Sequence, residues 1–215
     1  MKALFRKYIN NKIKLDKTQK ISIICLTIVI SGFFGWTYEY IFYYFNFGMT
    51  KFYWQGGNFL PWINIYAIGA VMIIILTHKY KKNPLKIFLI AMISTGILEY
   101  ISGLVIYKLK DGLRLWDYNT EILNFGNIGG FVCLRSVLFF GISSLLLVYV
   151  ILPCLIYLAK KINKKTLLII SITLLSITLF DEFYNLIFAR ILNLPRAKDV
   201  YESIGIEFMK YNKNI

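Results

Sequence analysis

Four ionisable side chains lie inside long apolar runs of this sequence, and they are its first candidates for chemistry. They are Glu39, Glu99, Arg135 and Asp181. A charge inside a membrane is costly, so such residues mark functional sites by default. Carboxylates that lie together can do acid–base work or hold a divalent cation through oxygen ligands.

Two interpretations of these charges stay open. One is a structural ion pair, in which Arg135 bonds Glu99 or Glu39 and locks the helices together. The other is a binding site, and four acids near one arginine exceed what a single ion pair needs, which favours it. The site would be an outward-facing polar cavity lined by Glu39, Glu99, Arg135 and Asp181, with Asp117 and Asn127 at its lid.

The depth of the charges supports a common site. At a rise of about 1.5 Å per residue, Glu99, Arg135 and Asp181 each fall roughly 20 Å from the inner face of an apolar core about 30 Å thick. Arg135 ends a polar stretch, residues 113–135, which we expect to join two membrane-spanning helices on the outer side.

Several classes of site are excluded or unsupported. The sequence has no G-x-x-x-x-G-K-[ST] phosphate loop and no H-E-x-x-H motif, and its one histidine, His78, lies in a basic turn. The three cysteines, Cys25, Cys133 and Cys154, lie in apolar runs without metal-ligand spacing. We therefore predict no metal and no cofactor, and we assign no catalytic residue.

The elements that must position these residues are apolar helices. Hydrophobic residues make up 58% of the chain, charged residues only 17%, and the mean hydropathy is +0.60. We predict an all-α, polytopic transmembrane helix bundle of about five spans. A basic segment, residues 1–20, precedes the bundle at 21–194, and a polar tail follows at 195–215. The spans are expected at about 21–47, 60–77, 85–107, 128–158 and 166–192.

The net charge of +14 is explained by membrane topology. Lys and Arg cluster in residues 1–20 and in the turns at 79–86 and 160–165, whereas the intervening loops carry few. This alternation predicts a cytoplasmic N-terminus in a multi-pass protein of the plasma membrane, with the lipid bilayer as its partner. A nucleic-acid partner is not expected, and the sequence does not indicate an oligomeric state.

Ordered motifs carry a resemblance to a known family. They are Gly35-Trp36-x-Tyr38-Glu39, Pro61-x3-Ile65-Tyr66-x2-Gly69-Ala70, Leu98-Glu99-Tyr100, Trp116-Asp117-Tyr118 and Asn127-x2-Gly130-x2-Cys133-Leu134-Arg135, followed by Gly141. In this order they resemble a family of small bacterial inner-membrane proteins classed as ABC-transporter permeases, the CmpB-like or type IV family. Asp181 is similar to the acidic residue of that family's last span.

The resemblance also has departures. Phe131 stands where the family usually has arginine, and the chain carries extra residues between Tyr118 and Asn127. The resemblance implies a permease-like transport component, with a separate ATPase subunit docking on the inner turns at 78–86 and 159–165. Two alternatives remain: a membrane enzyme that acts on a lipid or lipid-linked substrate at the outer leaflet, and a non-catalytic scaffold or regulator.

Overall fold

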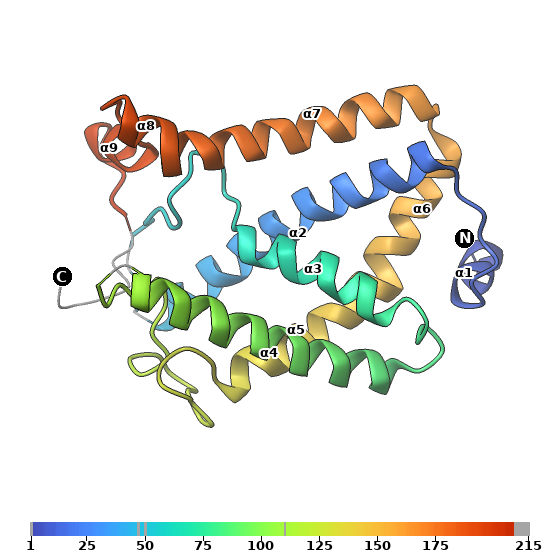
Figure 1. The fold of residues 1–215 in the computed structure, drawn as a ribbon, viewed down its shortest axis with the longest axis horizontal. Coiled ribbons are helices and arrows are strands. Elements are labelled where there is room, and N and C mark those ends of the chain that lie inside the picture. The colour runs from blue at the N-terminus through green and yellow to red at the C-terminus, as the bar shows by residue number, and fades with distance from the viewer. Residues whose placement is uncertain (1, 47, 50, 110, 209–215) are drawn as a thin grey trace. The chain divides into compact units, whose positions relative to one another are not determined.

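All the regular secondary structure in the described residues is helical, which confirms the all-α prediction. The computed structural model describes residues 2–46, 48–49, 51–109 and 111–208 (Figure 1). Within these ranges it has no β-strand, only two isolated bridges. The helices are α1 (Lys2–Ile9), α2 (Lys17–Asn46), α3 (Asn64–Thr77), α4 (Pro84–Leu109), α5 (Leu134–Leu146), η1 (Leu147–Ile151), α6 (Leu152–Lys161), α7 (Lys164–Phe183), η2 (Tyr184–Phe188), α8 (Ala189–Ile191) and α9 (Ala197–Ser203).

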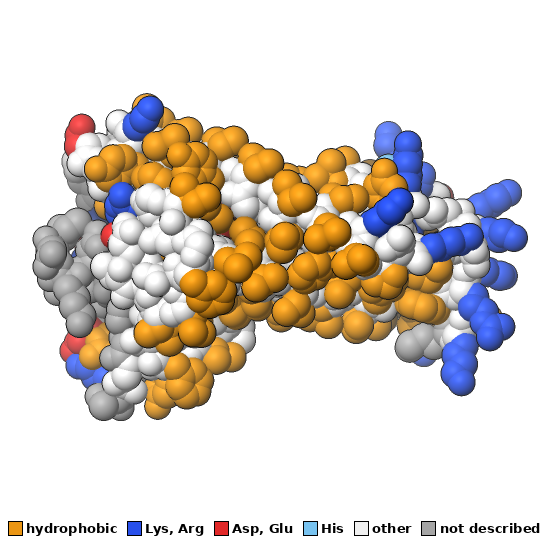
Figure 2. Space-filling model, turned by 90° about the horizontal axis from the view of Figure 1, so that it is seen from below, with side chains coloured by type: hydrophobic (Ala, Val, Ile, Leu, Met, Phe, Trp, Pro, Cys, Tyr) orange, Lys and Arg blue, Asp and Glu red, His pale blue; other side chains and the backbone are white. Residues whose placement is uncertain are grey.

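Four helical segments are long and apolar enough to cross a membrane: Lys17–Asn46, Pro84–Leu109, Leu134–Lys161 and Lys164–Ile191. Each corresponds to a predicted run. The remaining run contains α3, which has 14 residues and is shorter than the roughly 20 that a span perpendicular to the bilayer needs. Figure 2 shows many hydrophobic side chains exposed on the face in view. Extensive exposed apolar surface is typical of a membrane protein.

The described chain folds into two compact units. The first contains residues 2–13 and 72–153, and the second contains residues 14–71 and 154–208. In the first unit α4 packs against α5. Small residues allow this close packing: a Cβ at Gly96 would lie 2.8 Å from Val137, and a Cβ at Gly141 would lie 2.6 Å from Phe88. Glycine at such positions is what close helix packing in membranes uses.

In the second unit α2 packs against α7. The segment before α3 also lies against α2, because the Gly32 carbonyl accepts a hydrogen bond from the Ile63 N–H at 3.2 Å. A Cβ at Gly32 would overlap the Trp62 indole, so only glycine permits this approach. The predicted second span begins at residue 60, whereas the helix begins at Asn64. The difference arises because residues 60–63 bond elsewhere instead of starting a helix: the Leu60 N–H donates to Asp181 and the Ile63 N–H to the Gly32 carbonyl.

The long segment Leu134–Lys161 is continuous past its proline. The predicted fourth span was expected to be interrupted or to end near Pro153. Instead five residues, Leu147–Ile151, form a π-helical turn directly before α6. Proline has no N–H to donate and its ring crowds the carbonyl four residues earlier, so a wider turn before it relieves both problems. The same segment begins at Leu134 instead of residue 128, because residues 128–133 form a turn with a bridge between Ile128 and Val132.

The chain's ends carry short helices. Residues 2–9 of the basic N-terminal segment form α1, and residues 197–203 of the polar tail form α9. The last residue of the predicted first span, Phe47, lies outside the described residues, as do Lys110 and, in the polar tail, Lys210 and Lys213.

Candidate functional site

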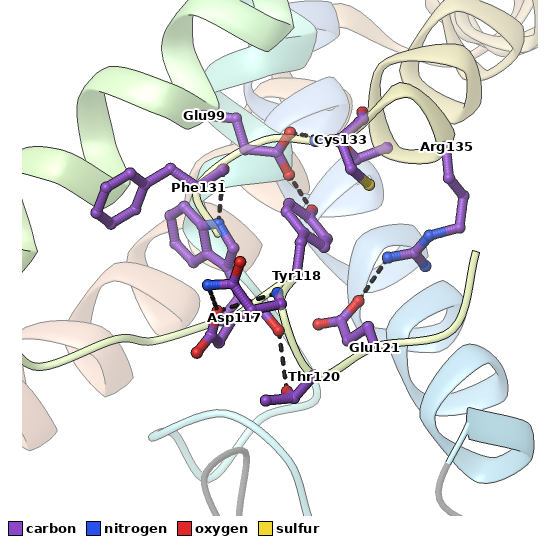
Figure 3. A network of polar contacts seen from close by, with 11 residues as sticks. Glu99, Asp117, Tyr118, Thr120, Glu121, Phe131, Cys133 and Arg135 are labelled. Atoms are coloured by element: carbon purple, nitrogen blue, oxygen red, sulfur yellow. Dashed lines mark hydrogen bonds and ion pairs between the residues drawn. The ribbon is translucent and has the colours of Figure 1, made fainter. Parts of the chain in front are cut away.

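Glu99 is the centre of a buried polar cluster in the first unit. It lies in α4, and only 5% of the residue is exposed. One carboxyl oxygen accepts a hydrogen bond from the Tyr118 hydroxyl (Figure 3), and the other accepts one from Ser136 Oγ at 2.8 Å. Tyr118 belongs to the polar stretch before α5, and Ser136 to the first turn of α5. Three separate parts of the unit therefore meet at one carboxyl group.

Ser136 connects Glu99 to the start of α5. Its hydroxyl lies 2.8 Å from the Cys133 carbonyl oxygen and accepts a hydrogen bond from the Cys133 N–H at 3.3 Å. A serine hydroxyl has one hydrogen, so it donates either to Glu99 or to the Cys133 carbonyl. An ionised Glu99 takes that hydrogen. A protonated Glu99 can donate to Ser136 Oγ, which then donates to Cys133. The cluster keeps its hydrogen bonds in both states of Glu99.

Arg135 pairs with Glu121 and makes no ion pair with Glu99 (Figure 3). The arginine and glutamate side chains are 12% and 3% exposed. The Arg135 guanidinium also lies 5.3 Å from the centre of the Tyr118 ring. Because the Tyr118 hydroxyl bonds Glu99, this ring separates the ion pair from the α4 carboxyl. In this structure the arginine of the expected structural ion pair is therefore bonded to Glu121 instead of Glu99.

Tyr118 is held as a neutral phenol. Burial raises the pKa of its hydroxyl well above the ordinary value of about 10, and the neighbouring Glu99 carboxyl raises it further. The phenol therefore stays a hydrogen-bond donor to Glu99 over the physiological range.

Asp117 and Asn127 organise the loop that carries Tyr118. Asp117 Oδ1 accepts from the side chain of Asn119 at 2.7 Å, and Asn127 donates to the Asn119 side-chain oxygen at 2.8 Å. Asn127 Oδ1 also accepts the Gly130 N–H at 2.8 Å, and the Gly130 carbonyl accepts the Tyr118 N–H at 3.1 Å. Asp117 and Asn127, the two predicted lid residues, thus use their hydrogen bonds to hold this loop in place. The loop in turn fixes the orientation of the Tyr118 side chain.

Phe131, where the sequence departs from the family pattern, supports an arginine from another part of the loop. The Arg114 guanidinium lies 4.5 Å from the Phe131 ring centre and 4.9 Å from that of Tyr107. Arg114 also donates to the Gly129 carbonyl at 2.8 Å and lies 3.7 Å from Asp117. The Arg114 guanidinium therefore lies over the ring of Phe131, the residue that stands where the family usually has arginine.

Asp181 has a different environment, in the second unit. Its carboxylate accepts the backbone N–H groups of Phe59 at 3.0 Å and Leu60 at 2.7 Å, and the Asn185 amide at 2.8 Å. Asn185 in turn accepts the Ala197 N–H at 2.7 Å. These contacts attach the loop before α3 and the start of α9 to the end of α7. Asp181 is thus a structural anchor of this unit.

The neighbouring acid, Glu182, binds side chains instead of backbone. It accepts from Asn58 at 2.6 Å and from Asn64 at 2.9 Å. Glu39, the remaining predicted site residue, lies in α2 of the second unit and is half-buried.

Of the six predicted site residues, the first unit contains four, and these form one connected region with the α4 carboxyl at its centre. They are Glu99, Arg135, Asp117 and Asn127. Glu39 and Asp181 belong to the second unit, so a single cavity lined by all six stays a prediction. Sequence reasoning missed Glu121 and Ser136. The signal for Glu121 was an acid in an otherwise apolar part of the extra loop residues. Among the described residues, no three His, Cys, Asp or Glu side chains are grouped to hold a metal ion.

The comparisons with known proteins agree with the sequence motifs. A model of the family described as "Putative ABC-transporter type IV" matches residues 26–186. The matched range includes all six predicted site residues and confirms the resemblance. Searches of curated proteins and of solved structures gave no match.

Proposed function

The chain belongs to this ABC-transporter type IV family, and we propose that it is a permease-like component of a membrane transport system. In this proposal it is a multi-pass protein of the plasma membrane, and its Glu99 cluster binds a proton or the positively charged group of a transported solute. The four long apolar segments support the membrane location.

One observation carries the role of Glu99. Among the described residues, its carboxyl is bonded to two hydroxyl groups and to no lysine or arginine. A carboxyl locked by an arginine would be fixed in its ionised state, because neutralising it would leave a buried cation unpaired. Hydroxyl groups accept and donate, so this cluster tolerates both charge states. That tolerance is what a site needs if it is to take up and release positive charge.

A second feature is that the loop carrying Tyr118 contacts both Glu99 and Arg135. Tyr118 and Glu121, which hold Glu99 and Arg135, lie only a few residues apart in the segment that Asp117 and Asn127 organise. A movement of this segment would release the α4 carboxyl and the α5 arginine together. Opposite charges would then become available to a polar solute at the same moment.

The test of this role is a substitution that removes titration but keeps the shape. Glu99→Gln retains an oxygen acceptor and the side-chain length. We expect it to abolish complementation of a deletion strain while the melting temperature of the purified protein changes by only a few degrees. Glu202→Gln, at an exposed acid of α9, is the matched control and should complement fully. If Glu99→Gln complements and only the melting temperature falls, the cluster is structural.

The transport assignment has its own test. As part of an ABC system the chain needs a separate ATP-hydrolysing subunit, since it has no phosphate loop of its own. We expect such a subunit to co-purify with the tagged full chain in mild detergent. Replacing Lys160, Lys161, Lys164 and Lys165 by glutamine should weaken that association. A changed lipid profile in the deletion strain, without any co-purifying ATPase, would instead support the lipid-enzyme alternative.

A further inference from the structure

The N-terminal helix α1 is attached to the turn between α3 and α4 through one lysine. Lys81 Nζ donates to Asn11 Oδ1 at 2.8 Å and lies 4.2 Å from the centre of the Tyr8 ring. On the other side of the turn, the Tyr149 hydroxyl donates to the Lys81 carbonyl at 2.9 Å. The Phe5 ring lies 6.5 Å from the Tyr149 ring. Helix α1 is therefore packed onto the end of the first unit.

The Lys81 ammonium is half-buried and its charge is not neutralised. No described carboxylate forms an ion pair with it, and residues 1–15 and 78–98 contain no Asp or Glu. Burial accordingly lowers the pKa of Lys81. Beside it, Tyr8 is 4% exposed, and its buried hydroxyl has no hydrogen-bond partner among the described residues. A buried polar group without a partner is unfavourable, so an added hydrogen-bond acceptor at this place would be stabilising.

The surrounding surface is basic and exposed. Helix α1 exposes Lys2, Arg6 and Lys7, and the nearby turn and the start of α4 expose Lys79, Lys82 and Lys86. The turn lies only a few residues before α4, one of the segments long and apolar enough to cross a membrane. Cations so close to the end of a span lie at headgroup level, and α1, which contacts the same turn, must lie there too.

We propose that α1 and the turn at residues 78–83 form a binding surface for anionic phospholipid headgroups, with a headgroup phosphate at the Lys81 ammonium. The phosphate supplies the negative charge that this part of the unit lacks and takes the two ammonium hydrogens that Asn11 leaves free. The exposed cations of α1 add attraction to the leaflet surface. This inference is independent of the transport assignment.

The experiment measures the melting temperature of the full-length protein in neutral detergent during titration with single lipids. Dioleoylphosphatidylglycerol should raise it by a few degrees, whereas dioleoylphosphatidylcholine and inorganic phosphate should not, because a ligand stabilises the fold that binds it. Each basic residue near an anionic surface contributes about 1 kcal/mol, or about fivefold in affinity. Lys81→Gln should therefore require roughly fivefold more phosphatidylglycerol for the same shift.

Controls separate the site from general charge. Lys108→Gln removes the same charge from the other end of α4 and should leave the response unchanged. Lys81→Arg should restore most of it, and combined replacement of Lys2, Arg6 and Lys7 by glutamine should weaken it further. Equal stabilisation by the two lipids, or an equal shift with phosphate alone, would overturn the lipid proposal. If Lys81→Gln leaves the lipid response intact but loses a co-purifying ATPase subunit, this surface binds a protein instead.

Discussion

A substitution at Gly130 would perturb the loop that orients the Tyr118 side chain and would leave the Glu99 side chain itself unchanged. The φ of Gly130 is +80°, a conformation that is unfavourable for any residue that has a Cβ. An added Cβ would lie 2.5 Å from Asp117 Oδ1 and would also overlap the side chains of Arg114 and Asn119. The change Gly130→Ala must therefore both strain the backbone and displace the loop's polar network.

Gly56 separates these two effects. Its φ is +79°, almost the same as that of Gly130, but an added Cβ would meet nothing within 4 Å. Gly56→Ala should cost only the backbone term, about 1–2 kcal/mol. Gly130→Ala should add the loss of about two hydrogen bonds at roughly 1 kcal/mol each. The total for Gly130→Ala is then about 3–4 kcal/mol.

The assay is thermal unfolding of both variants in the same detergent. At about 2–4 °C per kcal/mol for a chain of this length, the difference of about 2 kcal/mol means that Gly130→Ala should melt about 4–8 °C below Gly56→Ala. Because the loop carries Tyr118, Gly130→Ala should also reduce complementation, whereas Gly56→Ala should not. Equal melting temperatures for the two variants would show that the Arg114–Asp117–Asn119 network does not stabilise the loop, and the argument for an organised Tyr118 would fail.

Two further predictions concern the acids of the second unit. Asp181→Asn should lower the free energy of unfolding by about 2 kcal/mol, because an amide cannot accept from every N–H group that faces it. Glu182→Gln should lower it less. Unfolding of both variants checks this, and equal losses would contradict it. The Lys164 hydrogen bond lowers the pKa of Asp16, so its stabilisation is present above the ordinary value near 4 and is lost as pH falls through the folded-state value. The melting temperature of wild type should exceed that of Asp16→Asn at pH 7, and the difference should vanish in acid; a constant difference would refute the linkage.

Much of the fold could be predicted from the sequence because long apolar runs in lipid must satisfy their own backbone groups as helices. Helix α4 begins at Pro84, one residue from the predicted start, since proline suits a position whose N–H would be free. The errors fall where tertiary contacts replace local preference. The Ile63 N–H bonds the Gly32 carbonyl, and residues 128–133 fold back through Gly129 and Gly130. Neither event leaves a periodic pattern in the sequence.

The candidate site was predictable in its residues but not in its pairings. Apolar surroundings single out Glu99 and Arg135 from the sequence alone, because charges there are rare. Which carboxylate meets Arg135 depends on how the residues between Tyr118 and Asn127 fold. Those residues bring Glu121 to the arginine, and nothing in the spacing of a non-helical segment fixes that contact. The contact of the Ser136 hydroxyl with Glu99 could not be predicted for a similar reason. Serine is common in apolar helices and usually bonds its own backbone.

Glu99 and Asp181 show why burial alone does not identify a functional acid. They are 5% and 7% exposed, and each lies ten residues before the last residue of a long apolar segment. Asp181 receives two backbone N–H groups, which can only donate, and these attach the loop before α3 to the end of α7. Glu99 receives two hydroxyl groups, and at least Ser136 can reverse its direction because the Cys133 carbonyl offers it another acceptor. The partners of Asp181 are therefore backbone groups with a fixed direction, whereas the partners of Glu99 are hydroxyl groups that can both donate and accept. Transport chemistry should be sought at Glu99 because of its hydrogen-bond partners, and substitutions at Asp181 should be read as tests of the fold.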